Sequence, residues 1–229
     1  MNWRMLSGSG NHNYYLHDTL GLSFGFQWTG DYGVNIQEKR RSSLLMQDRP
    51  LTFSKNVFLP LTTVCRNRCG YCCFRTPVQD GCLMAPAEVE RTLNRGAALG
   101  CTEALFTFGE RPEEEPGFSA LIRAAGYPTI LDYCEAMCKK SIEYGILPHT
   151  NAGILSFHEL ERFRKVNASM GLMLETTAQV PAHRGSKGKE PEIRIAMIED
   201  AGKLKIPFTT GLLLGIGETM ADRSSPWRV

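Results

Sequence analysis

The feature that most constrains the fold is a regular alternation of short apolar segments with amphipathic helical segments from residue 51 onward. The apolar segments are rich in β-branched residues and are expected to be strands over 56–65, 102–110, 146–153, 168–175 and 207–217. Leucine and alanine spacing, early prolines and terminal glycines predict helices over 84–101, 129–145, 156–166 and 191–205. The chain therefore reads as about five βα units.

Strict βα alternation predicts an α/β fold with a parallel sheet, either a barrel or an open doubly wound sheet. The predicted strands do not alternate cleanly between apolar and polar residues, as is typical of strands covered on both faces. In both architectures ligands lie at the carboxyl ends of the strands. Five chemically capable residues stand at or just beyond a predicted strand end: Cys65, Glu110, Asn151, Glu175 and Glu218.

Composition excludes several classes of protein. The formal net charge of +2 comes from dispersed basic residues, so a nucleic-acid partner is not expected. No stretch approaches the ~18 consecutive apolar residues of a membrane span. The amino-terminal segment lacks the apolar core of a signal peptide. We therefore expect a cytoplasmic protein in a reducing compartment, where clustered cysteines are more often metal ligands or catalytic groups than disulfides.

The segment "CRNRCGYCCF", which begins at Cys65, holds four of the eight cysteines. A disulfide, a zinc site, a redox pair and an iron–sulfur cluster are all candidates. Zinc sites usually need four nitrogen or sulfur ligands, often as two separated pairs, and no second pair is visible because Cys134 and Cys138 fall inside a predicted helix. Cys65, Cys69 and Cys72 on one loop suit a [4Fe–4S] cluster that keeps one iron open.

The remaining cysteines are interpreted as packing residues, because a free cysteine behaves as a small hydrophobic side chain. Cys73 is predicted to be a small buried side chain next to the three candidate ligands. Core positions are predicted for Cys82, Cys101, Cys134 and Cys138.

The string "CRNRCGYC" resembles the CxxxCxΦC signature of radical S-adenosylmethionine (SAM) enzymes. The longer string "LTFSKNVFLPLTTVCRNRCGYCCFR" is similar to the ring-closing subunit of the deazaflavin (FO) synthases. "LFTFGERPEE", "PHTNAG", "SMGLMLETTA", "AHRGSKGKEPEIR" and "PFTTGLLLGIGET" continue the resemblance, which covers residues 51–219. It implies a partial TIM-type (βα) barrel of the radical SAM kind.

The resemblance also implies site residues. Tyr71 would lie near the adenine of SAM, and Glu110 in "FGE" would receive the SAM amino group. Glu175 and Arg194 resemble the pair used for the SAM ribose and carboxylate, and a guanidinium suits a carboxylate because its donors match both oxygens. An ordinary surface charge is the alternative for Arg194.

The last predicted strand carries "GLLLGIGE", which resembles the GxIxGxxE strand that backs the adenine in the family. Gly215 and Glu218 are therefore expected to be cofactor-binding, although the glycines also fit a plain close-packed strand. Asn151 is placed with the cofactor-binding residues because a polar side chain at a strand end can contact SAM or substrate. His149 and His183 are weaker candidates, and "HRGSKGK" also has the composition of a mobile surface loop.

By resemblance, the activity is that of a radical SAM lyase. The cluster cleaves SAM reductively, and the 5′-deoxyadenosyl radical takes hydrogen from a hydroxybenzyl–ribitylaminouracil adduct. Ring closure with loss of ammonia then gives the deazaflavin. The expected partners are this small-molecule substrate, a ferredoxin- or flavodoxin-type electron donor, and the subunit that makes the adduct.

The resemblance divides the chain into a poorly matched extension (1–50), a radical SAM core (51–219) and a non-family tail (220–229). Five strands cannot close a six-stranded partial barrel, so we expect a truncated or mis-delimited chain with one exposed sheet edge. Alternatives are an inactive or partner-completed remnant, a zinc or thiol structural module, and a related enzyme acting on another aromatic substrate, such as one of the menaquinone pathway.

Overall fold

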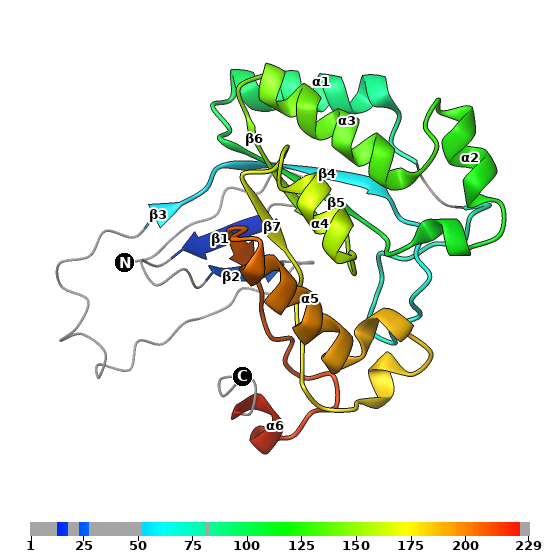
Figure 1. Cartoon of the computed structure of the whole chain (residues 1–229), viewed down its shortest axis with the longest axis vertical. Helices are drawn as coiled ribbons and strands as arrows, with labels where there is room; N and C mark the ends of the chain where they lie inside the picture. Colours follow the sequence, from blue (N-terminus) through cyan, green and yellow to red (C-terminus); the bar gives the residue numbers. More distant parts are fainter. Residues whose placement is uncertain (1–12, 18–22, 28–51, 81–82, 225–229) are drawn as a thin grey trace.

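The computed structural model describes residues 13–17, 23–27, 52–80 and 83–224, and its centre is a five-stranded parallel sheet (Figure 1). Its strands lie in chain order, so each βα unit adds the next strand at the same edge. The strands are β4 (Asn56–Thr62), β5 (Glu103–Phe108), β6 (Leu147–Asn151), β7 (Ser169–Gly171) and β8 (Phe208–Thr209). The predicted α/β class with a parallel sheet is confirmed.

The strands are buried on both faces, as their continuous apolar sequences predict. In β5 three successive residues, Ala104, Leu105 and Phe106, are all buried. Because successive side chains of a strand point to opposite faces, neither face of β5 is open to solvent. The register pairs Leu59 of β4 with Phe106 of β5, and Leu105 of β5 with His149 of β6.

All four predicted helices are present, and α1 packs beside α3 while α4 packs beside α5 (Figure 1). The predicted helices are α1 (Pro86–Ala98), α3 (Ile130–Glu143), α4 (Phe157–Phe163) and α5 (Pro191–Lys203). Two short helices were not predicted, α2 (Phe118–Ala124) and α6 (Met220–Ser224). In the part of the chain that the structure describes, no helix is long and apolar enough to cross a membrane.

Local sequence signals explain where the helices begin. α1 and α5 each start at a proline, whose missing N–H costs nothing in the first turn. α4 starts with a capping box between Ser156 and Glu159, and the side chain of Thr129 caps α3 by accepting from the Asp132 amide.

One apolar cluster joins the sheet to the helices, and it includes Phe106 of β5, Tyr133 of α3 and Phe163 of α4, each fully buried. Cys134 and Cys138 of α3 belong to the same cluster, as predicted for core cysteines.

A second sheet lies near the amino terminus. Strands β1 (Asn13–His17), β2 (Ser23–Gln27) and β3 (Thr52–Phe53) pair antiparallel in the order β2-β1-β3. No strand was predicted from the sequence within residues 1–50, so the first two strands were missed. Their sequences, "NYYLH" and "SFGFQ", are rich in the aromatic residues that favour strands, which the polar composition of the surrounding segment obscures.

The predicted strand over 207–217 is also wrong in its second half. β8 ends at Thr209, and beyond it only an isolated bridge joins Leu212 to Glu175. Gly215 and Gly217 have φ values of 87° and 109°, a region that favours glycine and is incompatible with a regular strand. This part of the chain is a turn.

Candidate active site

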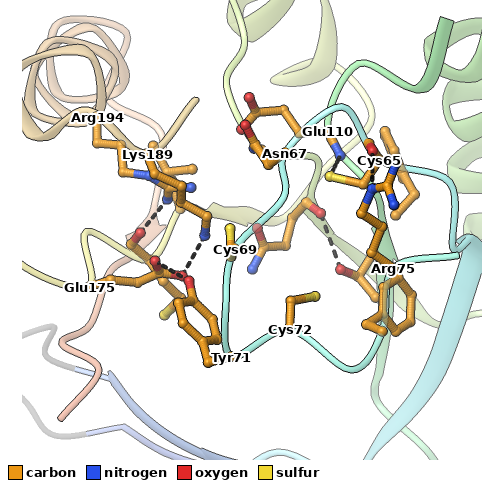
Figure 2. A pocket seen from close by; sticks show the side chains of 18 residues that line it. Cys65, Asn67, Cys69, Tyr71, Cys72, Arg75, Glu110, Glu175, Lys189 and Arg194 are labelled. Carbon is orange, nitrogen blue, oxygen red and sulfur yellow. Dashed lines mark hydrogen bonds and ion pairs between the residues drawn. The ribbon is translucent and has the colours of Figure 1, made fainter. Parts of the chain in front are cut away.

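A cavity of about 190 Å³ opens at the carboxyl ends of β4, β5, β6 and β7 (Figure 2). Eight of the ten residues predicted to form the site line it: Cys65, Cys69, Tyr71, Cys72, Glu110, Asn151, Glu175 and Arg194. The other two, Gly215 and Glu218, lie outside this cavity. The structure thus brings together, at the carboxyl ends of the strands, residues that are spread over 130 positions of the sequence.

A close approach of two strand ends positions the first cysteine. A Cβ on Gly109, just beyond β5, would lie 1.9 Å from the carbonyl oxygen of Val64, so only glycine fits there. This approach lets the Glu110 amide donate a hydrogen bond to Cys65 Sγ at 3.2 Å. The Arg66 amide in turn donates to the Glu110 carbonyl oxygen at 3.0 Å, which ties the cysteine loop to the end of β5.

The cysteine loop is held by further backbone contacts. Arg75 Nε donates to the Cys65 carbonyl oxygen at 2.9 Å, and the Cys72 amide donates to the Cys69 carbonyl oxygen at 3.1 Å. Cys65 and Cys69 are partly buried and Cys72 is exposed. Burial raises the pKa of the Cys65 thiol, although hydrogen bonds from the amides of Asn67 and Glu110 oppose the shift.

The donor set fits an iron–sulfur cluster. Three thiols from one loop line the same cavity, and a [4Fe–4S] cluster takes one thiolate on each of three irons. Among the described residues, no three His, Cys, Asp or Glu side chains converge closely enough to hold a single metal ion.

The fourth thiol of the loop corrects a prediction. Cys73 is exposed rather than buried. Cys101, predicted to be a core residue, is only partly buried. Cys82 lies outside the described residues.

Glu110 is a buried carboxylate that already has partners. Its Oε1 accepts hydrogen bonds from Arg66 Nε at 2.9 Å and Nη2 at 2.8 Å, and its Oε2 accepts from the Ile154 amide at 3.1 Å. A Cβ on Gly153 or Gly188 would lie 2.6 Å or 1.6 Å from atoms of this side chain, so both glycines are needed to seat it. The carboxylate predicted to receive the SAM amino group is thus fixed in orientation within the cavity wall.

Glu175 is the centre of a second cluster on the opposite wall of the cavity (Figure 2). Tyr71 Oη donates to its Oε2 at 2.6 Å, Lys189 Nζ lies 2.6 Å from its Oε1, and His183 Nε2 lies 3.1 Å from Oε2. Burial opposes ionisation, but the charges of Lys189 and Arg194 prevail and lower the pKa of Glu175. The site therefore holds a buried, ionised carboxylate among cations.

Arg194 is buried, so an ordinary surface charge is the wrong interpretation of it. Its Nε donates to the Gly188 carbonyl oxygen at 2.9 Å and its Nη1 donates to the Met173 carbonyl oxygen. The predicted pair of Glu175 and Arg194 lines one cavity, and the two side chains influence each other by charge without forming a direct ion pair.

The remaining polar candidates differ in position. Asn151 is the last residue of β6 and lines the cavity. His183 is buried beside Glu175, and its burial lowers the pKa of the imidazole while the nearby carboxylate opposes that shift. His149 is buried elsewhere in the sheet, with Nδ1 2.7 Å from Ser169 Oγ, and is not among the residues that line the cavity.

Four further polar residues line the cavity and were not predicted: Asn67, Arg75, Thr107 and Lys189. Asn67 and Arg75 belong to the cysteine loop, and their proximity in sequence to Cys65 was the available signal. Lys189 reaches Glu175 only because the segment around it folds back over the cysteine loop, which no local pattern indicates.

Glu218 belongs to the turn after β8. Its carboxylate accepts from the amides of Gly215 at 2.7 Å and Ile216 at 2.8 Å and lies 2.8 Å from Arg223 Nη2. These contacts, led by the Gly215 amide, lower the pKa of Glu218 to about 2. Its role in this structure is to close the turn.

The chain is similar in sequence to a group of curated synthases. The chain is 72% identical over 178 residues to the 7,8-didemethyl-8-hydroxy-5-deazariboflavin synthase of Methanoregula boonei, covering 78% of this chain and 54% of the relative. It is 67% identical to that of Methanoculleus marisnigri, covering 80% and 56%. The chain thus spans about half the length of the curated relatives it matches.

The fold matches that of a solved structure. Methylornithine synthase superposes with a TM-score of 0.57 at 17% identity, over 73% of this chain and 47% of that one, which supports the fold alone. The model of the Radical SAM superfamily matches residues 59–225, which include the whole cavity and all three candidate cysteine ligands. The chain belongs to the radical SAM superfamily.

Proposed function

We propose that this chain carries the cofactor site of a radical SAM lyase of the deazaflavin-synthase type. The observation that carries the proposal is the convergence of eight predicted site residues on one cavity, seven of them from the ends of four strands and Arg194 from α5. The high identity to synthases named for 7,8-didemethyl-8-hydroxy-5-deazariboflavin supports the choice of branch.

Cys65, Cys69 and Cys72 would hold a [4Fe–4S] cluster, and the cavity between Glu110 and Glu175 would receive SAM. When bound, the cluster and SAM supply an electron and the 5′-deoxyadenosyl radical that removes hydrogen from the substrate. The protein's own part is to bind, orient and exclude water.

The two buried carboxylates define how SAM would be oriented. Glu110, fixed by Arg66 and a backbone amide, presents negative charge toward an ammonium group. On the other wall, Lys189 and Arg194 bring positive charge, which suits the SAM carboxylate. An amino acid group bound between the two walls would meet opposite charges at its two ends.

The proposed substrate is the adduct of a hydroxybenzyl group with ribitylaminouracil, which closes to the deazaflavin ring with loss of ammonia. We propose that a ferredoxin- or flavodoxin-type protein in the cytoplasm donates the electron, and that the subunit that makes the adduct supplies the substrate. The exposed Cys72 side of the loop is the accessible approach to the cluster position.

The test is anaerobic turnover of the reconstituted chain with dithionite, SAM and the adduct. Formation of 5′-deoxyadenosine together with the deazaflavin, detected by its fluorescence, would support the proposal. Deoxyadenosine without deazaflavin, but with conversion of another aromatic substrate, would replace the substrate assignment. Iron binding with no deoxyadenosine under any condition would identify a remnant that has lost turnover.

A further inference from the structure

The cysteine loop is covered by a segment that lies more than a hundred residues later in the chain. We call this segment, residues 180–190, the clasp. It contains two short 3₁₀ helices, Pro181–His183 and Lys187–Lys189. Three hydrogen bonds donated by backbone amides join it to the cysteine loop: Gly70 N to Ala182 O at 2.7 Å, Arg68 N to Ser186 Oγ at 2.9 Å, and Gly188 N to Asn67 Oδ1 at 3.1 Å.

Ser186 is the buried centre of the clasp, with 2% of its surface exposed. Its amide donates to the His183 carbonyl oxygen at 2.9 Å, and its carbonyl oxygen accepts from the Lys189 amide at 2.9 Å. The backbone on both sides of Ser186 is therefore fixed, and the position of its hydroxyl is set by the clasp rather than by a free rotation of the loop.

The hydroxyl of Ser186 has two neighbours on the cysteine loop. It accepts a hydrogen bond from the amide of Arg68, and Cys69 Sγ lies 3.6 Å from its oxygen. Because a hydroxyl has one proton to donate and the Arg68 contact uses a lone pair, the proton remains for another acceptor. A thiolate bound to iron carries no proton, so toward Cys69 in that state the serine must be the donor.

Tyr71 also carries a hydroxyl that interacts electrostatically with Cys69. Its single proton goes to Glu175 Oε2, at 2.6 Å, a short hydrogen bond to an ionised carboxylate. Among these two hydroxyls, Ser186 is the one with a proton available for the sulfur.

We propose that Ser186 is a positioning residue of the cluster site: its hydroxyl fixes the Arg68 amide and donates a hydrogen bond to the sulfur of Cys69. This inference rests on the proposed function, because it assigns a role toward a cluster held by Cys69. Hydrogen bonds to the sulfurs of a cluster stabilise its reduced, more negative state and raise its reduction potential. The clasp thus sets how readily the cluster accepts an electron.

Three variants separate this role from a merely structural one. Ser186→Ala removes the hydroxyl, and Ser186→Thr restores one at the same position. Ser141→Ala is the matched control, because Ser141 is a buried serine on α3 whose hydroxyl donates to Ile146 O at 2.8 Å and which does not line the cavity.

The first readout needs no cluster. Hydrogen exchange of the Arg68 amide in the apo protein is expected to be about five- to tenfold faster in Ser186→Ala, since one buried hydrogen bond contributes about 1 kcal/mol. Ser186→Thr and Ser141→Ala are expected to keep the wild-type rate. An unchanged rate in Ser186→Ala would overturn the assigned contact.

The second readout is the reduction potential of the reconstituted cluster, followed by electron paramagnetic resonance during a redox titration. Ser186→Ala is expected to shift the potential to a more negative value, Ser186→Thr to return it toward the wild type, and Ser141→Ala to leave it unchanged. Equal potentials in wild type and Ser186→Ala would overturn the proposal while leaving the proposed function intact. Failure of the wild-type chain to form any cluster would instead overturn the proposed function, and with it the role toward Cys69.

Discussion

The chain segments that follow β4–β7 and the segment that follows β8 behave differently. On the β4–β7 side, the residues beyond the strands converge: Cys65, Glu110, Asn151 and Glu175 all line one cavity. Beyond β8 the chain turns on itself, and Glu218 satisfies its own turn. In the described sheet, β5, β6 and β7 each have a strand on both sides, whereas β8 is an edge strand of two residues. β4 is also an edge strand, but it is seven residues long. Pairing on both sides, or along a long strand, fixes where a chain leaves the sheet, and the two-residue edge strand β8 does not.

The largest expected difference between the two kinds of region concerns the cysteines. Cys69→Ala should abolish cluster binding, so that iron per reconstituted chain falls from about four in the wild type to nearly none. Cys134→Ala makes the same substitution at a buried cysteine of α3 outside the cavity and should leave the iron content unchanged. Iron and sulfide analysis after anaerobic reconstitution measures both.

Cys73→Ser sharpens this comparison, because Cys73 belongs to the same loop but is exposed and is not among the residues that line the cavity. It should bind iron as the wild type does. Loss of iron in Cys73→Ser, or retention of full iron in Cys69→Ala, would show that the ligand set is assigned wrongly.

The second comparison is between two of the three predicted glutamates, Glu175 and Glu218. Glu175→Gln removes the charged acceptor that the resemblance assigns, with Arg194, to the SAM ribose and carboxylate, and that Lys189 and His183 also face. It should weaken SAM binding by about 10- to 100-fold, in line with 1.5–3 kcal/mol for a charged hydrogen bond. Glu218→Gln should change SAM affinity by less than about twofold, because its contacts with the Gly215 and Ile216 amides and with Arg223 lie outside the cavity. Equilibrium binding of SAM to reconstituted protein distinguishes them, and a larger effect at Glu218 would reverse the assignment of the two regions.

A third comparison uses two glycines. A Cβ at Gly188 would lie 1.6 Å from Glu110 Oε1, whereas a Cβ at Gly202 on α5 meets nothing within 4 Å. Gly188→Ala should destabilise the protein by about 1–3 kcal/mol through overpacking. Gly202→Ala should stabilise it by roughly 0.5–1 kcal/mol through helix propensity. Urea unfolding measures both, and equal midpoints for the two variants would argue against the close seating of Glu110.

The smallest expected effect is on the pH dependence of stability, and it concerns charged residues of the helices outside the two regions compared above. Partial burial opposes ionisation of Asp132, but hydrogen bonds from Thr129 and Arg162 lower its pKa; Lys139, and then Arg162, lower the pKa of Glu135. Because the folded-state pKa values are depressed, this stabilisation is present above the ordinary carboxyl pKa of about 4 and is lost as the pH falls through the folded values.

Arg162→Gln should therefore reduce the acid-induced loss of stability between about pH 5 and pH 3 by less than about 1 kcal/mol, since these ion pairs are partly exposed. Urea midpoints measured across that range for wild type and variant test this. A steeper loss in the variant would contradict the sign of the two shifts.

The sheet and its helices were predictable because they follow from local patterns. Continuous apolar runs predicted β4, β5 and β6, and proline and glycine signals predicted the helices between them. The same patterns failed where apolar residues do not imply a strand. "GLLLGIG" is as apolar as a strand, but the positive φ angles of Gly215 and Gly217 make it a turn. Helix α2 is short and follows a segment rich in glutamate and proline, which hid it.

The strand-end residues of the site were predictable from the sequence, and the clasp that covers the cysteine loop was not. Spacing and resemblance identified Cys65 and Glu175, but neither predicts burial, as the exposure of Cys73 shows. The clasp has the composition of a mobile surface loop, yet Ser186 is buried in it. Its contacts join residues up to 121 positions apart, and a local sequence pattern has no information on such a distance.

We propose that the carboxyl ends of β4–β7 form the cofactor site of a radical SAM enzyme. The most direct measurement combines iron content after anaerobic reconstitution with 5′-deoxyadenosine released on addition of dithionite and SAM, in wild type and in Cys69→Ala. We expect about four irons per chain and release of deoxyadenosine in the wild type, with loss of both in the variant. A wild-type chain that binds no iron, or a variant that still cleaves SAM, would contradict it.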